Sequence, residues 1–228
     1  MQSSLLYDET LPRVRSRLRQ VRGPVRSNDR MAPIWQLIHA IISGRTLDTV
    51  SWAALERLMI CWAEPEGIMA ARPEEVEAVI FDVEHAEPKS RWLVAALRML
   101  HNAHGDLTLG FLSDLPTEAA FRKLRNLTGV GPKAAATTLN FSSLKRRIMV
   151  VDTHVCRTAN RLGFAFHKDL GKAHTEFSRH IDPAWDGDDL YELHWLLKRH
   201  GQEVCVDGAP ACGRCPLADL CPSARMVQ

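Results

Sequence analysis

Four of the six cysteines in this 228-residue chain lie within residues 205–221, with the spacing C-x6-C-x2-C-x5-C. The segment between the first two, 206–211, contains Gly and Pro and is too short to form a helix. Four thiolates in so short a stretch are the ligand set of a zinc site or of an iron–sulfur cluster. The spacing alone does not choose between the two. The candidate ligands are Cys205, Cys212, Cys215 and Cys221.

Two disulfides are the alternative explanation for these cysteines. Disulfides are typical of small secreted domains that cannot build a sufficient core, whereas a chain of this length can bury one. The N-terminal region carries arginines but no apolar signal-peptide core, which indicates a reducing, intracellular compartment. No apolar run reaches membrane-spanning length, so we expect no membrane segment. The sequence therefore favours a metal site.

The net charge of +2 permits nucleic-acid binding without requiring it, because a basic face can be local. Several arginines concentrate near the N-terminus. They indicate either a phosphate-binding face or an ordinary solvated helix surface, and the sequence does not separate the two interpretations. These residues are Arg13, Arg15, Arg17, Arg19 and Arg22.

Apolar residues recur at helical spacing through most of the chain, for example over 34–42, 93–100 and 190–197. Gly and Pro interrupt these runs at short intervals, and only 148–151 suggests a brief strand. We therefore predict an all-α fold of about ten short helices that ends in the metal-bound loop. Cys61 and Cys156 lie among apolar residues and are expected to be buried.

A second informative motif is L-T-G-V-G-P-K at 127–133. Its glycines supply a tight turn open to positive φ, and Pro132 suits the first position of a new helix. Backbone N–H groups at such a helix start are free to bind a phosphate. Taken alone, the turn is an ordinary helix–helix connection. It is followed, however, by V-D-T-H-V at 151–155, in which Asp152 is placed to cap a helix, and by H-W-L-L at 194–197 and H-G at 200–201.

These motifs and the cysteine loop, in this order, resemble the endonuclease III branch of the helix-hairpin-helix DNA glycosylases. The resemblance extends over most of the chain, from Ile34 to Cys221. It implies two helical lobes with a DNA-binding cleft between them. One is a six-helix barrel with the helix-hairpin-helix motif over 34–145, and the other is an iron–sulfur helical lobe formed by 1–33 with 146–228. The resemblance also implies that the four cysteines bind a [4Fe–4S] cluster.

The resemblance implies roles for individual residues as well. Lys133 falls on the family's nucleophilic lysine and Asp152 on its catalytic aspartate. Gly129, Val130 and Gly131 fall on the hairpin that grips DNA phosphates and that can also hold a monovalent cation. The implied enzyme is a base-excision repair DNA glycosylase with AP lyase activity on damaged bases or abasic sites in duplex DNA. We expect a monomer that acts on double-stranded DNA in the cytoplasm or nucleoid.

The reaction itself requires these residue types, for chemical reasons that do not depend on the resemblance. Cleavage of the glycosidic bond builds positive charge on the sugar, which a carboxylate such as that of Asp152 stabilises. A neutral amine at C1′ can displace the base and form a Schiff base, from which the 3′ phosphate leaves by β-elimination. Lys133 lies in the first turn of its helix, where the dipole disfavours a cation. An exposed lysine at such a position is ordinarily only a solvated charge, and the order of the motifs assigns it the catalytic role.

The chain departs from the family pattern in the loops that read DNA. The first loop, S-A-Q-x-T-D in the family, reads S-G-R-T-L-D here, so Arg45 stands where the gap-filling glutamine is expected. The planar guanidinium group of Arg45 can bind guanine through two hydrogen bonds. The second loop reads E-H-A-E-P-K-S over 84–90. His85 therefore stands at, or one residue away from, the position where the family has the leucine that wedges between the DNA strands. Lys89 of the same loop is a further DNA-contacting candidate. Segment 206–211 lacks the family's basic residue, so one phosphate contact is expected to be missing. These changes predict a divergent member with an altered lesion preference.

Two other functions remain open at this point. One is a monofunctional glycosylase of the same fold, which releases the base without cutting the strand. The other is a catalytically silent iron–sulfur protein that binds DNA or senses redox state. Lys133 favours the bifunctional enzyme over the monofunctional one, and Lys133 with Asp152 favours an enzyme over a silent protein. Oxidised pyrimidines, abasic sites, mismatches and alkylated bases all remain candidate lesions.

Overall fold

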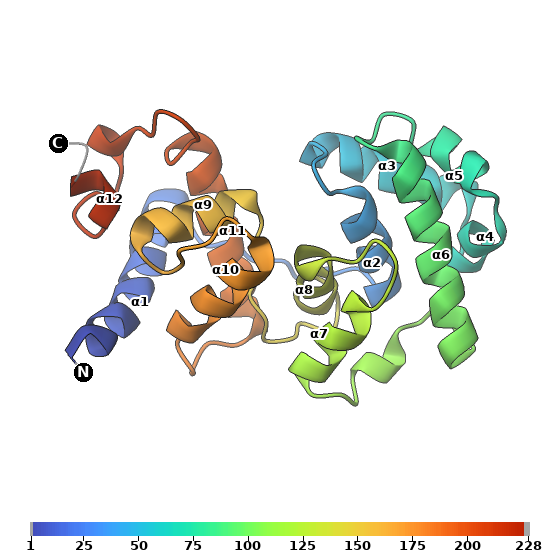
Figure 1. The fold of residues 1–228 in the computed structure, drawn as a ribbon, viewed down its shortest axis with the longest axis horizontal. Helices are drawn as coiled ribbons and strands as arrows, with labels where there is room; N and C mark the ends of the chain where they lie inside the picture. Colours follow the sequence, from blue (N-terminus) through green and yellow to red (C-terminus); the bar gives the residue numbers. More distant parts are fainter. Residues whose placement is uncertain (1, 226–228) are drawn as a thin grey trace. The chain divides into compact units, whose positions relative to one another are not determined.

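The computed structural model describes residues 2–225, with side chains from residue 10 onward. Within that range it contains twelve α-helices, three 3-10 turns and no strand, which confirms the predicted all-α fold (Figure 1). Segment 148–151, where a brief strand was suggested, is not part of any strand. No described helix is both long and apolar enough to cross a bilayer. The chain forms two compact units, the hairpin unit (Asp29–Leu144) and the cysteine unit (Met1–Asn28 with Lys145–Gln228).

The hairpin unit consists of seven α-helices and one 3-10 turn, Gly110–Leu112. In chain order its helices are α2 (Pro33–Ile42), α3 (Asp48–Cys61), α4 (Pro65–Ala70), α5 (Pro73–Val79), α6 (Ala86–His104), α7 (Thr117–Arg125) and α8 (Pro132–Phe141).

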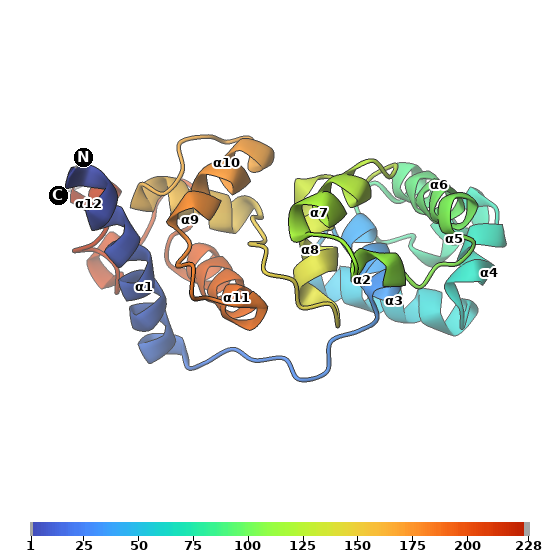
Figure 2. The ribbon, with the colours of Figure 1, turned by 90° about the horizontal axis from the view of Figure 1, so that it is seen from below.

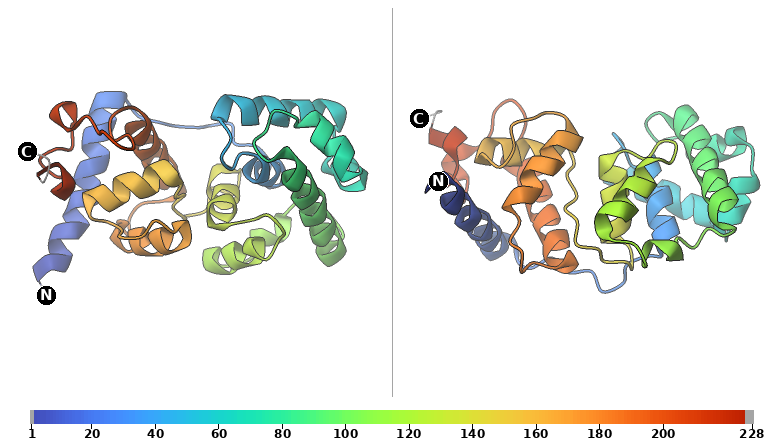
Figure 3. Two further views of the ribbon diagram at one scale, coloured as in Figure 1. Left: turned by 45° about the horizontal axis from the view of Figure 1, so that its top comes forward. Right: turned by 60° about the horizontal axis from the view of Figure 1, so that its bottom comes forward.

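Helix α2 forms the centre of the hairpin unit. Its sequence, PIWQLIHAII, is apolar on nearly every side, and eight of its ten residues are buried. A helix that is apolar all round must be enclosed by others, and α2 contacts α3, α6 and α8. Three consecutive alanines at 134–136 are among the buried residues of α8, and such small side chains let it lie close to α2. The long helix α6 packs along α4 and α5 (Figure 3).

The cysteine unit contains the remaining helices, α1 (Gln2–Arg22), α9 (Thr153–Leu162), α10 (Leu170–Phe177), α11 (Gly187–Glu203) and α12 (Pro222–Arg225), with 3-10 turns at Ser178–His180 and Cys212–Arg214. Leu11, Val14 and Leu18 place one apolar stripe of α1 in the core. The stripe brings α1 from the start of the chain against α11 near its end (Figure 2). Helices α1 and α11, which are far apart in the sequence, therefore share one core.

Four of the five N-terminal arginines make ion pairs inside the cysteine unit, a use that neither sequence interpretation included. The pairs attach α1 to α11 and to the C-terminal loop that carries the four cysteines, so these side chains stabilise the fold. They are Arg15 with Asp189 and Glu192, Arg17 with Asp219, Arg19 with Glu192, and Arg22 with Glu203.

The two cysteines outside the terminal loop differ in their surroundings. Cys156 is buried, as expected from its apolar context. Cys61 is exposed, and the expectation of burial was wrong for it. Cys61 ends α3, and the buried residues of that helix stop at Leu58, so the last turn runs past the core.

Candidate functional site

The hairpin between α7 and α8 needs one of its two glycines for conformational reasons. Gly129 has φ +77°, and a Cβ there would lie 2.6 Å from Cβ of Trp92, so both the backbone and the packing require glycine. Gly131 is the N-cap of α8 with φ −83°, which any residue adopts. Val130 is only 6% exposed, and its backbone N–H donates to the carbonyl of Leu127 at 3.1 Å, so this residue holds the turn together. Pro132 begins α8 as predicted.

Lys133 lies in the first turn of α8, immediately after the hairpin. It is half-buried, and its Nζ donates to Oγ of Ser43 across 3.1 Å. Ser43 is the C-cap of α2, so the amine lies where the beginning of α8 meets the end of α2. The hydroxyl of Ser43 itself donates to the carbonyl of Ala40 at 3.3 Å, so it accepts from Lys133, whose nitrogen can donate as an ammonium or as a neutral amine.

Asp152 is the N-cap of α9, as its sequence context predicted. Its Oδ1 accepts a hydrogen bond from the backbone N–H of Val155 at 2.8 Å, and the residue is 8% exposed. The helix N-terminus favours the charged carboxylate. Asp152 belongs to the cysteine unit and Lys133 to the hairpin unit.

The two loops that the resemblance assigned to DNA reading both carry a strained residue. Arg45 and His85 each have φ +59°, a left-handed conformation that non-glycine residues rarely adopt and that is often found at functional sites. Both side chains are exposed. The loops are joined, because Oγ1 of Thr46 accepts a hydrogen bond from the backbone N–H of Glu84 at 3.2 Å. Leu47, 74% exposed, is an apolar neighbour of Arg45 that the sequence analysis did not select.

Lys89 is the candidate whose surroundings differ most from expectation. The residue is 3% exposed, and its Nζ donates to the carbonyls of Ile42 and Gly44, at 2.7 Å and 2.5 Å, and to Oγ1 of Thr46 at 3.1 Å. All three acceptors lie at or just after the end of α2. An ammonium enclosed in this way is not presented to a DNA phosphate, so we do not carry Lys89 forward as a DNA contact. Thr46 was not predicted as a site residue, although it directly follows the DNA-contacting candidate Arg45 in the sequence.

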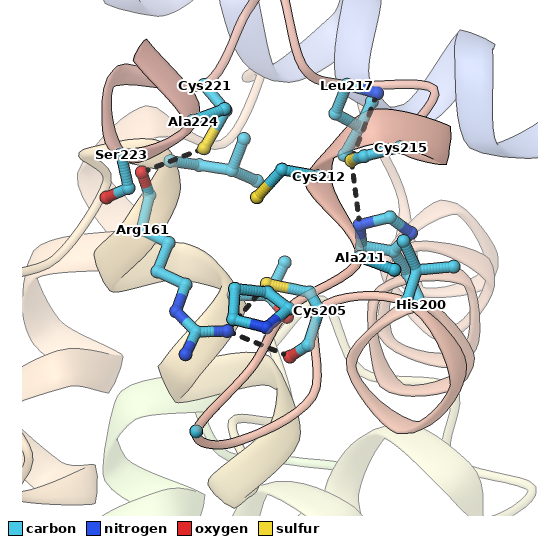
Figure 4. Close-up of a pocket in the computed structure, with 15 residues that line it drawn as sticks. Arg161, His200, Cys205, Ala211, Cys212, Cys215, Leu217, Cys221, Ser223 and Ala224 are labelled. Carbon is cyan, nitrogen blue, oxygen red and sulfur yellow. Dashed lines mark hydrogen bonds between the residues drawn. The ribbon is translucent and has the colours of Figure 1, made fainter. Parts of the chain in front are cut away.

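The four cysteines of the C-terminal loop line one cavity of about 210 Å³ (Figure 4). No three His, Cys, Asp or Glu side chains in the described part of the chain are close enough to hold a single metal ion. A zinc site needs its sulfurs about 2.3 Å from one centre, whereas an iron–sulfur cluster binds each cysteine through a separate iron. The sulfurs ring the cavity, which fits a cluster and not a single zinc.

Hydrogen bonds from the surrounding protein hold the cysteines in place. Arg161 of α9 donates from Nη1 to Sγ of Cys205 at 3.3 Å, and the backbone N–H of Leu217 donates to Sγ of Cys215 at 3.4 Å. Nε2 of His200 lies 3.6 Å from the same Cys215 sulfur. Partners of this kind orient metal ligands and tune a cluster.

The electrostatics of the cavity agree with a metal site. Burial raises the pKa of the Cys215 and Cys221 thiols, and the neighbouring cysteines raise it further. Thiolates in such surroundings need a nearby positive charge, which a metal centre supplies. Burial also lowers the pKa of His200 to about 4, with a smaller contribution from Arg22, so its imidazole is neutral near pH 7.

Comparison with known proteins identifies the loop. Residues 209–221 match the model of the iron–sulfur binding domain of endonuclease III. The chain is 28% identical over 193 residues to endonuclease III-like protein 1 of Gallus gallus, an alignment that covers 83% of this chain and 63% of that protein. It is also 28% identical to endonuclease III of Rickettsia prowazekii over 81% of both chains. The matched segment contains three of the four cysteines, and the shared cavity adds Cys205.

Solved structures agree on the fold. A trapped endonuclease III–DNA covalent intermediate matches with a TM-score of 0.78 over 96% of this chain and 98% of that one, at 21% identity. The fold of this chain is therefore endonuclease III-like, and its cysteine loop matches the iron–sulfur binding domain of endonuclease III. A thermostable thymine-DNA glycosylase matches this endonuclease III-like chain with a TM-score of 0.68, at 17% identity and over 99% and 98% of the two chains. The predicted resemblance and the predicted [4Fe–4S] cluster are both confirmed.

Proposed function

We propose that this chain is a DNA repair enzyme that excises damaged bases from duplex DNA and cleaves the strand at the resulting abasic site. The observation that carries the proposal is the position of the Lys133 amine, in the first turn of α8 directly after the hairpin and at the end of α2. The endonuclease III solved as a trapped covalent DNA intermediate supports covalent chemistry for an enzyme of this fold.

The hairpin supplies the phosphate-binding part of the proposed site. Gly129 and Gly131 are exposed and carry no side chain that would keep a DNA backbone away. The N-terminus of α8 follows at Pro132, where free N–H groups and the helix dipole favour a phosphate. We further propose that backbone carbonyls of this turn hold a monovalent cation when DNA is bound.

Lys133 and Asp152 supply the proposed chemistry at a nucleotide that has been flipped out of the duplex. The neutral amine of Lys133 attacks C1′, and the bond to the base breaks with its electron pair leaving on the base. The carboxylate of Asp152 stabilises the positive charge that develops on the sugar. Asp152 also accepts the proton that the lysine nitrogen loses. The C1′–O4′ bond of the sugar then breaks, with its electron pair and a proton going to O4′, and the Schiff base forms between C1′ and the lysine nitrogen. Loss of a proton from C2′ then expels the 3′ phosphate by β-elimination.

The remaining parts of the site concern substrate and partner. Arg45 and His85 are exposed on joined loops, where they would enter the gap left by the flipped nucleotide and contact the opposite base. The partner is double-stranded DNA with a damaged base or abasic site, bound by a monomer. For an enzyme with a DNA substrate we propose a location in the cytoplasm or nucleoid. The [4Fe–4S] cluster, held by Cys205, Cys212, Cys215 and Cys221, orders the C-terminal loop.

A borohydride trapping experiment tests the proposed activity. The protein is incubated with a duplex that contains an abasic site and with duplexes that contain individual damaged bases. We expect a covalent protein–DNA adduct and strand nicking with at least one substrate. Lys133→Gln should abolish both while retaining the helical spectrum and much of the DNA binding. The matched control is Lys168→Gln, the same change at an exposed lysine of the cysteine unit.

The possible outcomes separate the alternatives. Base release without adduct or nicking would make the protein a monofunctional glycosylase. Binding without release of any base would make it a silent iron–sulfur DNA-binding protein. Undiminished nicking by Lys133→Gln would remove this lysine from the mechanism.

A further inference from the structure

We propose that Lys89 is a positioning residue for Lys133. Its buried ammonium fixes the turn on which the Lys133 amine lies and, as a nearby positive charge, favours the neutral, nucleophilic form of that amine. The inference rests on the proposed role of Lys133 as the Schiff-base nucleophile, and it adds a second lysine that touches neither DNA nor sugar.

The geometry places both lysines on one short turn. Lys89 comes from α6 and binds the carbonyls of Ile42 and Gly44, while Lys133 comes from α8 and binds the hydroxyl of Ser43, the residue between them. The carbonyls at the end of a helix carry partial negative charge and are good acceptors for a cation. Lys89 therefore acts as the cap of α2 and holds in place the residue that contacts the Lys133 amine.

The electrostatics couple the two amines. The pKa of Lys89 is lowered to about 8, chiefly by burial and also by the positive charge of Lys133, while Glu84 acts in the opposite direction. The interaction between two like charges is shared, so a charged Lys89 disfavours protonation of Lys133 in turn. Such a pair gives up its first proton more readily than a lone lysine does.

The hydrogen bonds of Lys89 favour its charged form. Its Nζ donates to two carbonyl oxygens, which can only accept, and to the hydroxyl of Thr46. An ammonium, with three N–H groups, satisfies these three acceptors better than a neutral amine does. With a pKa of about 8, Lys89 is mostly charged at neutral pH and can act on Lys133.

The other titratable groups around this pair leave the coupling in place. From α2, His39 is bonded to Ser51 of α3 at 3.2 Å. From the turn itself, Arg45 is exposed and adds a further positive charge on this side of the pair. The charged residues of α4, α5 and α7 are at least partly exposed. Glu84 acts on Lys89 as a negative group and favours the charged form that the proposal needs. Asp152, the proposed proton acceptor of Lys133, is present in wild type and in both Lys89 variants, so it does not alter the comparison between them.

The pH dependence of covalent trapping tests this coupling. Single-turnover adduct formation on an abasic duplex is followed with cyanoborohydride from about pH 5 to about pH 9 for wild type, Lys89→Met and Lys89→Arg. Lys89→Met removes the charge and keeps the chain length, so the pH midpoint should rise by about one unit, with about a tenfold lower rate on the acidic side. Lys89→Arg keeps a permanent charge, so its midpoint should lie at or below that of wild type.

Each outcome bears on the inference. A lower rate with an unchanged midpoint in Lys89→Met would reduce Lys89 to a structural residue and overturn the proposal. If Lys89→Met does not fold, as judged by circular dichroism, Lys89→Arg decides: a midpoint above that of wild type would overturn it. A wild-type protein that forms no adduct at any pH would overturn the proposed function, and this inference with it.

Discussion

Arg161 Nη1 lies 3.3 Å from Sγ of Cys205, while the backbone carbonyl of Arg161 lies 3.2 Å from Sγ of Cys221. One residue of α9 therefore touches both the first and the last cysteine of the loop. The same Nη1 also donates to the carbonyls of Cys205 and Val206, at 3.2 Å and 2.7 Å. The guanidinium holds the loop closed around the cavity that the four sulfurs line.

The first prediction concerns this contact. Protein purified without oxygen should be brown and contain about four irons per chain. Arg161→Met should contain less iron and lose the visible absorbance of the cluster faster in air, because the loop loses its hydrogen bonds to α9. Iron analysis and absorbance decay measure the effect, with Arg179→Met, at an exposed arginine of the same unit, as control. Equal iron content and lifetime would contradict the role of Arg161, and a colourless protein with one zinc would contradict the cluster.

The second prediction separates two roles of Asp152. Asparagine is also a good N-cap, so Asp152→Asn should leave α9 and the fold intact. The charge is lost, however, and it matters most as the sugar becomes cationic. Single-turnover base release should slow by about 100-fold or more, while the Kd for lesion DNA changes little. Equal losses in base release and in binding would mark Asp152 as a structural cap alone.

The third prediction concerns Arg45, which is exposed and has φ +59° on the turn beside Lys133. The wild-type protein should prefer guanine opposite the lesion, because the guanidinium can bind it with two hydrogen bonds. Arg45→Gln should reduce that preference by about 1–3 kcal/mol. Excision rates on one lesion placed opposite each of the four bases measure it, with Arg91→Gln as control. No preference in wild type, or the same preference in Arg45→Gln, would leave Arg45 as a surface charge or phosphate contact.

The fourth prediction compares two arginines of α1. Arg15 binds Asp189 and Glu192, and the Glu192 side chain is 5% exposed, so Arg15→Met leaves a buried carboxylate short of a partner. The free energy of unfolding should fall by about 3 kcal/mol. Arg17 pairs with Asp219 at the surface, where solvent screens the charges, so Arg17→Met should lower the free energy of unfolding much less than Arg15→Met. Urea denaturation of the holoprotein measures the free energy of unfolding of both variants. Equal losses in the two variants would contradict the conclusion that the Arg15 ion pairs are buried and the Arg17 ion pair is not.

The same network predicts a pH dependence. Burial opposes ionisation of Asp189, but hydrogen bonds from the backbone of Asp186 and from Arg15 outweigh it and lower the pKa of that carboxyl. A carboxyl with a lowered folded-state pKa adds stability above its unfolded pKa of about 3.9 and loses it as the pH falls through the folded value. The stability difference between wild type and Arg15→Met should therefore narrow below about pH 4. A difference that stays constant into more acidic solution would count against this explanation.

The fifth prediction tests the hairpin. Gly129→Ala forces a Cβ into Trp92 and a strained φ on alanine, so it should destabilise the protein by about 1–3 kcal/mol. Gly131→Ala meets nothing within 4 Å and needs no unusual φ, so the stability should change by less than about 0.5 kcal/mol. Thermal unfolding of the two variants is the measurement. A similar loss in both would show that the turn, and not the single position, is sensitive to added bulk.

Local patterns determined much of this protein by themselves. The cysteine spacing predicted a metal loop, the apolar periodicity predicted an all-α fold, and Asp152 was predicted as a helix cap from its immediate neighbours. Each of these features depends on interactions within a few residues or on a ligand set carried by one short segment. Such information is present in the order of residues, so it could be interpreted without the fold.

Only the tertiary structure decided where the basic side chains point. Lys89 reads as an exposed DNA contact in sequence, yet its ammonium binds a carbonyl 47 positions away at the end of α2. In the sequence Arg15 is one of several similar arginines, yet in the structure it donates a hydrogen bond to Glu192, which is 177 positions away in the chain. A long cationic side chain has the same local sequence signature whether it faces solvent or a buried acceptor. The packing of helices that are distant in sequence decides which acceptor lies near the side chain. A buried charge without a partner is strongly destabilising, so the cation pairs with the acceptor that this packing brings close.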